Sequence, residues 1–170
     1  MYDGGMTKHP PGTADELLDA VGPAFGKLRR SSLLDVENPI SQKDLSRTLV
    51  LNIVLEGEQA DEAREITVGA VAEHLSVDPS VASRMVSDSI GAGYLIRTAS
   101  QQDGRRTILH LSPEGRELMA RFRRHQRSAF EYVTADWPED ERLEFARLML
   151  KYVAAQNALR RQAGDQDTAR

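Results

Sequence analysis

Residues 66–111 read ITVGAVAEHLSVDPSVASRMVSDSIGAGYLIRTASQQDGRRTILHL, and this stretch indicates the fold more clearly than any other part of the chain. Thr67 can cap a short helix whose apolar residues recur at helical spacing as far as Leu75. The segment Ser76-Val77-Asp78-Pro79 then reads as a turn, an N-cap and a proline at the first helical position. A second helix follows until Gly91-Ala92-Gly93 ends it. The first half of the stretch therefore predicts two helices joined by a tight turn.

The second half of the stretch predicts a β-hairpin. Residues 94–98 and 107–111 have the composition of short strands. Between them, residues 101–106 hold a glycine-containing turn with two adjacent arginines. A helix, a tight turn, a capped helix and a two-stranded hairpin, in this order, make a winged helix-turn-helix. We therefore expect a mainly α fold with a small β-hairpin wing.

The charge of the chain is unevenly distributed. The 170 residues carry a net charge of −4, yet nine arginines oppose only four acidic residues between positions 79 and 127. That segment therefore carries +5, and the remainder carries −9. Basic residues clustered in an acidic chain are typical of a confined phosphate-binding surface. A solvated helix face, or an arginine bias set by genome base composition, would produce the same count.

The second predicted helix carries a polar arc. Ser80, Ser83, Arg84 and Ser87 share one face, because their separations make them neighbours on a helix. An α-helix fits the major groove of duplex DNA, where each base pair shows a distinct pattern of donors and acceptors. Short hydroxyls would let this helix approach the groove floor, while Arg84 could reach a guanine edge or a phosphate. Asp78 is better explained as the helix cap, and the alternative for the whole arc is an ordinary solvent-exposed face.

The predicted hairpin tip also suggests DNA binding. Asp103 stands two residues before Arg105 and could orient its guanidinium through a charge-assisted pair. An arginine held at the end of a hairpin can enter the minor groove, where the negative potential attracts it. Arg106 is better placed for a phosphate, with help from arginines early in the helix that follows Ser112. The alternative is a surface turn with an incidental ion pair of little energetic value.

Taken together, these segments resemble the MarR family of transcriptional regulators. The combination is specific, although each piece alone is weak, and outside residues 66–115 only the placement and apolar pattern of the helices match. In that family the pattern usually has Leu where Ser89 stands and a polar residue where Ile90 stands. The matching pieces lie at 67–75, 78–86, 93–97, 103–106 and 111–115.

The resemblance implies a homodimeric, sequence-specific regulator of double-stranded DNA. Outer helices, here near residues 13–36 and 112–160, would interlock two subunits. The helix from Asp78 would read the major groove and Arg105 the minor groove. Repression by promoter exclusion is implied, and activation stays open. Many relatives bind a small aromatic acid between the dimer helices and the DNA-binding domain, so such an effector is a possible partner here.

The expected organisation combines this unit with helices on both sides. Thr13 and Ser41 look like N-caps of two helices, the first kinked or split at Gly22-Pro23 and the second ending near Leu55. An acidic loop at 56–65, a helix from Ser112 to about Thr134 and a last helix after Trp137-Pro138 complete the pattern. We expect a disordered tail at 1–12, dimerisation and scaffold helices at 13–55, the winged DNA-binding domain at 56–112, C-terminal dimerisation helices at 113–162 and a disordered tail at 163–170.

Other chemistries find little support in the sequence. The chain has no cysteine, which removes disulfides, thiolate catalysis and thiol-based redox sensing. Its four histidines lack metal-ligand spacing, and it shows no phosphate-binding loop, dinucleotide turn or nucleophile elbow. We therefore expect a cytoplasmic protein that is not an enzyme and needs no cofactor. The second hypothesis is a winged-helix protein-interaction module in which the arginines are incidental.

Overall fold

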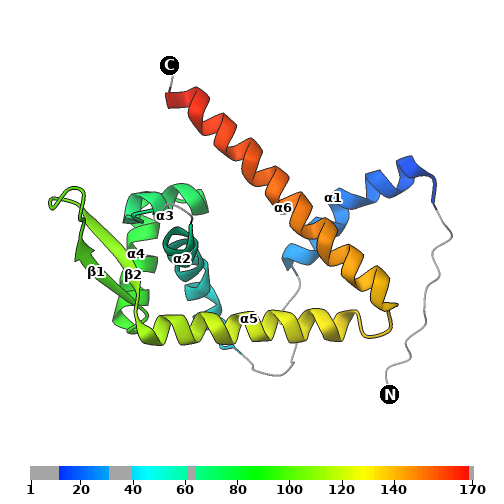
Figure 1. Cartoon of the computed structure of the whole chain (residues 1–170), viewed down its shortest axis with the longest axis horizontal. Helices are drawn as coiled ribbons and strands as arrows, with labels where there is room; N and C mark the ends of the chain where they lie inside the picture. Colours follow the sequence, from blue (N-terminus) through cyan, green and yellow to red (C-terminus); the bar gives the residue numbers. More distant parts are fainter. Residues whose placement is uncertain (1–11, 31–39, 61–63, 169–170) are drawn as a thin grey trace. The chain divides into compact units, whose positions relative to one another are not determined.

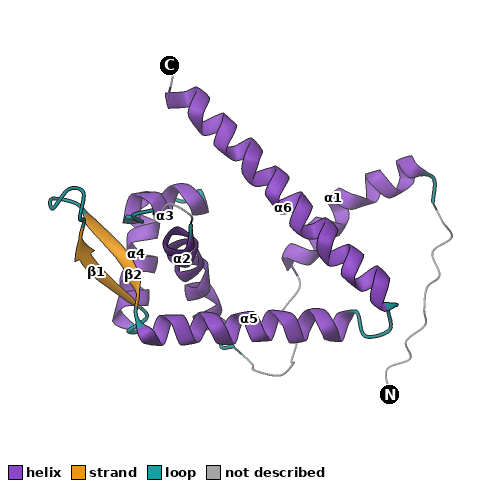
Figure 2. Cartoon of the chain, in the orientation of Figure 1, coloured by secondary structure: helices purple, strands orange, loops and turns teal. Residues whose placement is uncertain are grey.

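The computed structural model describes residues 12–30, 40–60 and 64–168. The chain divides into two units, Met1–Asp35 and Val36–Arg170. The described part contains six helices and one two-stranded hairpin, which confirms the predicted fold class (Figures 1 and 2). The predicted disordered tail at 1–12 falls, apart from Gly12, on positions outside the described residues. The elements are α1 Ala14–Arg30, α2 Gln42–Gln59, α3 Val68–Leu75, α4 Pro79–Gly91, β1 Leu95–Ala99, β2 Thr107–Leu111, α5 Pro113–Val133 and α6 Glu139–Thr168.

Helix α1 begins at the predicted capping box. The Thr13 N–H donates to Glu16 Oε2 at 2.8 Å, and the Glu16 N–H donates to Thr13 Oγ1 at 3.3 Å. The predicted split at Pro23 is wrong, because α1 continues through this residue. The predicted kink stays a prediction, since an interior proline removes one backbone hydrogen bond and its ring crowds the carbonyl four residues earlier. Leu17, Leu18 and other apolar residues of this helix are exposed within the described chain.

Helix α2 is the centre of the hydrophobic core, and it is longer than the sequence predicts. Its N-cap is Ser41 as expected, but it runs to Gln59 instead of ending near Leu55. Glu56 and Glu58 belong to this helix and not to the predicted acidic loop. Asn52 Nδ2 donates to Glu56 Oε1 at 2.6 Å. Gly57 lies so close to Ile66 that a Cβ would overlap its side chain, and this places the end of α2 against the segment leading into α3.

Helices α3 and α4 form the predicted helix-turn-helix. Thr67 caps α3, and Ser76 makes the turn in the left-handed conformation with φ of 53°. Asp78 is the N-cap residue of α4, but its side chain makes no capping hydrogen bond, so only the position of the predicted cap is confirmed. Ser89 is fully buried and donates to the Met85 carbonyl at 3.0 Å, while Ile90 packs against the core. Both residues that depart from the family pattern therefore face inward.

The hairpin packs beside α4 and against the beginning of α5, as Figure 1 shows. Its strands are antiparallel, with Leu95 opposite Leu111 and Ala99 opposite Thr107. Each strand lies within one residue of its predicted bounds. The Leu109 N–H donates to the Ile66 carbonyl at 2.8 Å, which joins the hairpin to the segment before α3. The wing is thus anchored to the helix-turn-helix and not only to its own strands.

Helix α5 starts at the predicted Ser112 cap, whose hydroxyl accepts from the Gly115 N–H at 2.9 Å and donates to the Gly93 carbonyl at 2.6 Å. A Cβ at Gly115 would overlap the Tyr94 carbonyl oxygen, so glycine permits this close approach of α5 to the residue that precedes β1. Helix α6 runs to Thr168, beyond the predicted start of a disordered tail at 163. None of the described helices is both long and apolar enough to cross a membrane.

Candidate nucleic-acid interface

Helix α4 has one buried and one exposed face. Ala82, Val86 and Ser89 are buried in the core. Because the arc proposed from the sequence lies on the other side of the helix, the structure leaves all of it open to solvent. The exposed residues of this arc are Ser80, Ser83, Arg84 and Ser87.

Arg84 has few internal contacts. Its Nε donates to the carbonyl of Ser80 on the same helix at 3.4 Å, a long hydrogen bond. An open depression of about 270 Å³ lies beside it, lined by Arg84 itself and by Ser46, Arg47, Met85 and Asp88. Among the described residues, no ion pair involves the Arg84 guanidinium. This cation is therefore available to an anion from outside the chain.

The hairpin tip is held by backbone hydrogen bonds. Asp103 Oδ1 accepts from the backbone N–H of Arg105 at 3.1 Å, and the Asp103 carbonyl accepts from the Arg106 N–H at 2.8 Å. The prediction that Asp103 orients the guanidinium of Arg105 is wrong, since no ion pair joins these two side chains in the described chain. A carboxylate two residues before an N–H closes a local turn with less loss of side-chain freedom than a pair with a long arginine. Asp103 thus shapes the loop and leaves Arg105 and Arg106 exposed.

The base of the wing contains a polar cluster that the sequence analysis missed. Ser100 is buried, and its hydroxyl donates to the carboxylate of Glu65 at 2.6 and 2.7 Å. The same hydroxyl accepts from the N–H groups of Gln102 and Asp103 at 3.1 and 3.0 Å. The Gln101 N–H donates to Glu65 Oε1 at 3.1 Å. Glu65, which the sequence placed in an acidic loop, therefore fixes the direction in which the wing leaves the domain.

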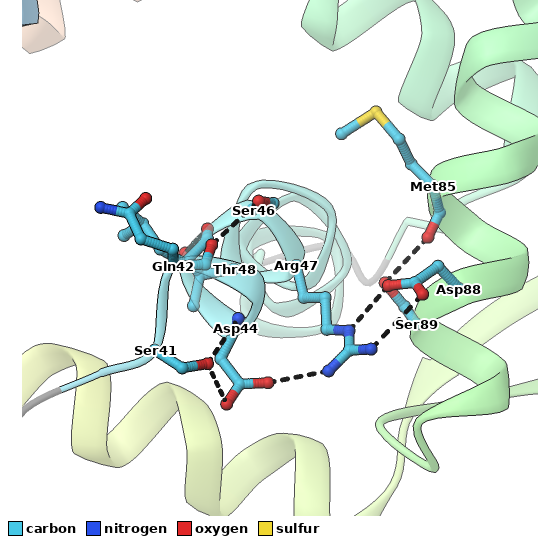
Figure 3. Close-up of polar contacts among 10 residues, drawn as sticks. Ser41, Gln42, Asp44, Ser46, Arg47, Thr48, Met85, Asp88 and Ser89 are labelled. Carbon is cyan, nitrogen blue, oxygen red and sulfur yellow. Dashed lines mark hydrogen bonds and ion pairs between the residues drawn. The ribbon is translucent and has the colours of Figure 1, made fainter.

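Arg47 on α2 is a second residue that the sequence analysis did not select. Its Nε donates to Asp88 Oδ2 at 2.7 Å, and its Nη1 donates to Asp44 Oδ1 at 2.9 Å (Figure 3). Its guanidinium carbon also lies 5.6 Å from the centre of the Tyr94 ring, within the range of a cation–π contact. The side chain is only 12% exposed. Arg47 therefore joins α2 to the C-terminal half of α4 and to the residue that precedes β1.

This cluster shifts the pKa values of its members toward their charged forms. The hydrogen bond from Arg47 is the largest influence on Asp88 and lowers the pKa of that carboxyl. Burial of Asp44 opposes ionisation, but hydrogen bonds from Ser41, Arg47 and Tyr94 outweigh it and lower its pKa. The bond to Asp88 likewise raises the pKa of Arg47 above its usual value. All three groups are thus charged throughout the neutral range.

The arginines of α5 have a different environment. Arg116 Nη1 lies 2.8 Å from Glu58 Oε2, and Glu58 Oε1 accepts from the Leu111 N–H at 3.1 Å. Arg116 therefore has an internal acidic partner, and its expected phosphate contact stays a prediction. Two further ion pairs, between Arg124 and Glu117 at 3.0 Å and between Arg127 and Glu131 at 2.9 Å, lie along the same helix.

The described residues contain no group of three His, Asp or Glu side chains arranged to hold a metal ion. His110 instead contacts Glu58, with Nδ1 3.2 Å from Oε1. His125 is buried in α5. The histidines at these two positions therefore belong to the packing of the domain.

Comparison with known proteins identifies the fold. No family model matches the chain, and no curated protein matches it. Similar solved structures are RV1404 from Mycobacterium tuberculosis (20% identity, TM-score 0.59, covering 87% of this chain and 97% of that one) and the YusO protein from Bacillus subtilis (19%, 0.56, 85% and 99%). A MarR family transcription regulator is also similar (17%, 0.55, 85% and 93%). The chain therefore has the winged-helix fold found in that family.

Proposed function

We propose that the chain is a MarR-family transcriptional regulator that binds double-stranded operator DNA as a homodimer. One observation carries this proposal: exposed arginines without ion pairs lie on α4 and the wing, whereas three of the five arginines of α5, Arg116, Arg124 and Arg127, are each paired with a glutamate in the described chain. A DNA-binding surface needs cations that phosphates and base edges can reach. In the proposed complex these cations lie on α4 and the wing, the two elements that would enter the grooves of DNA.

In the proposed complex, α4 lies in the major groove. Its N-terminal end directs backbone N–H groups and the positive end of the helix dipole toward phosphates. Ser80, Ser83 and Ser87 are short enough to let the helix come close to the base edges. Arg84 reaches a guanine edge or a phosphate from the same face. These four residues are the proposed source of sequence recognition.

The hairpin tip supplies the second proposed contact. Arg105 extends into the minor groove, where narrow A·T-rich segments concentrate negative potential. Arg106 binds the phosphate backbone. The hydrogen bonds of Asp103 and Ser100 support this arrangement, because they hold the backbone of the loop and leave both guanidinium groups exposed.

A homodimer would use the apolar faces of the outer helices. Large hydrophobic side chains on α6 are exposed in the single chain, among them Leu143, Leu150 and Leu159 at 60%, 72% and 67%. Helix α1 carries further exposed apolar residues. Large apolar side chains exposed in this way along a helix are characteristic of a protein–protein interface. Two subunits would then place their α4 helices in major grooves about 10 base pairs apart on one side of a pseudo-palindrome.

Promoter occupation by this dimer would repress transcription by exclusion. A small aromatic acid, bound between the dimer helices and the DNA-binding domain, would be the effector that releases it. Both parts of this proposal rest on the resemblance to the family.

Fluorescence anisotropy with labelled DNA tests the proposed function. The protein is titrated into the DNA upstream of its own gene and into a scrambled duplex of equal length, over a series of salt concentrations. We expect preference for the upstream fragment and affinity that falls steeply with salt, because binding releases condensed counterions. Equal affinity for both duplexes would contradict sequence-specific regulation. No binding at low salt would instead favour a protein-interaction module, whose apolar contacts would not weaken with salt.

A further inference from the structure

Arg84 and Asp88 are potential partners within α4. They are four residues apart, so their side chains emerge one above the other on the same face of the helix. Opposite charges at this spacing usually attract each other on an exposed helix surface. An Arg84–Asp88 pair would compete directly with any contact between Arg84 and DNA.

The structure shows Asp88 bound to another residue. Arg47 reaches across from α2 and donates to both carboxylate oxygens of Asp88, at 2.7 Å through Nε and at 3.4 Å through Nη2 (Figure 3). Arg84 makes no ion pair with Asp88 in the described chain, and its Nε donates instead to the Ser80 carbonyl. The open depression between α2 and α4 is lined by Arg47, Arg84 and Asp88 together, so the three side chains share one site.

Arg47 itself is held firmly in this site. Asp44 fixes the opposite side of its guanidinium at 2.9 Å, and the Tyr94 ring covers one face of it. The arginine is 12% exposed, whereas Asp88 is 48% exposed. A bidentate contact from an arginine that is already ordered costs little side-chain entropy and outcompetes a mobile helical neighbour.

We propose that Arg47 is a positioning residue for DNA recognition, which withholds the Asp88 carboxylate from Arg84 and so keeps the Arg84 guanidinium available to DNA. The inference rests on the proposed function and adds a residue that does not itself contact the nucleic acid. Arg47 also neutralises a carboxylate that would otherwise stand, as an unpaired negative charge, beside the DNA that Arg84 approaches.

Three variants test this role: Arg47→Ala, Asp88→Asn, and the double variant that combines them. Arg47→Ala should weaken operator binding about tenfold, the effect of losing one arginine contact with DNA. In the double variant no carboxylate remains to capture Arg84, so affinity should return to within about threefold of the wild type. Asp88→Asn alone should bind DNA at least as well as the wild type. Arg127→Ala, which removes an arginine of α5, is the matched control and should leave binding unchanged.

The rescue separates positioning from other roles of Arg47. If Arg47 only stabilised the fold, Asp88→Asn would lower both thermal stability and DNA affinity, and the double variant would be no better than Arg47→Ala. If Arg47 bound a phosphate directly, the double variant would stay weak and its salt dependence would lose about one phosphate contact. Either result would overturn the inference. Thermal unfolding followed by circular dichroism, on all variants, shows whether each one remains folded at the temperature of the binding assay.

A measurement without DNA separates failure of this inference from failure of the proposed function. The ¹⁵Nε–¹H signal of Arg84 is followed by NMR in the free protein. It should shift and exchange more slowly with water in Arg47→Ala, as Arg84 pairs with Asp88, and return to its wild-type position in the double variant. An unchanged Arg84 signal in Arg47→Ala would disprove the competition even if the wild type binds its operator. Absence of operator binding by the wild type would disprove the proposed function, and with it the role in recognition.

Discussion

Arg105 and Arg106 at the wing tip and Arg116 and Arg127 of α5 belong to one basic segment of the chain but have different surroundings. Arg105 and Arg106 are exposed, and the acidic residue nearest to them in sequence binds a backbone N–H. Arg116 and Arg127 each lie within 3 Å of a glutamate. A count of the cations in the sequence therefore overstates the area of a phosphate-binding surface. Only cations without an internal partner can replace the counterions of DNA at no cost to the fold.

Replacing Arg105 at the wing tip should cause the largest loss of operator affinity. Arg105→Ala should weaken operator binding by roughly 10- to 100-fold and reduce the slope of log affinity against log salt by about 1. The physical reason is the loss of a cation that has no competing internal contact. Anisotropy titrations at several salt concentrations measure both effects. Arg127→Ala is the control, and equal affinities of the two variants would show that the wing does not contact DNA.

The arginine of α4 should show a smaller loss that depends on the DNA sequence. Arg84→Ala should weaken operator binding about tenfold and should relax discrimination at one base pair, because a base-edge contact carries sequence information. Competition against operators with single base changes measures the discrimination. Arg124→Ala, on α5, should retain it. A uniform loss over all duplexes would instead identify Arg84 as a phosphate contact.

Because Arg116 is paired with Glu58, we expect its replacement to lower the stability of the fold and to leave DNA binding almost unchanged. Arg116→Ala leaves Glu58, whose side chain is 16% exposed, without its cationic partner. We expect the free energy of unfolding to fall by about 1 kcal/mol, given that the arginine is itself half exposed. Urea denaturation measures this change, and operator affinity should stay within about twofold of the wild type. A large loss of affinity in a variant of unchanged stability would contradict the division between the two groups.

Acid should weaken the ion pairs of Arg47, because it protonates the two carboxylates, Asp44 and Asp88, that this arginine binds. The pKa values of Asp44 and Asp88 are lowered in the fold, so their ionised forms contribute stability above the unfolded pKa near 4. That contribution is lost as the pH falls through the lowered folded values. Unfolding midpoints measured from pH 6 down to pH 2 should therefore decline less steeply for Asp88→Asn than for the wild type. Parallel curves would show that the Arg47 pair adds nothing to stability.

Much of the fold could be predicted because its signals are local. The caps Thr13, Ser41, Thr67 and Ser112 each bind an N–H three residues ahead, and the hairpin turn closes within six residues. The prediction was wrong where a distant partner changes a local preference. Helix α2 continues past Leu55, and Glu58 beyond that point contacts the hairpin and α5. The error at Asp103 has a local cause instead, because its carboxylate accepts from a backbone N–H two residues ahead and not from a guanidinium.

The sequence by itself therefore determined the order of the elements, their caps and the exposed arc of α4, since helical periodicity and short-range hydrogen bonds follow from neighbouring residues. Which charged side chains have an ion-pair partner within the chain follows only from the tertiary structure. Arg47 and Asp88 are 41 residues apart in the chain, Ser100 and Glu65 are 35 apart, and the Leu111 N–H meets Glu58 across 53. Such pairs form because packing of the core brings their elements together, and the residues next to each partner in the sequence give no sign of this contact.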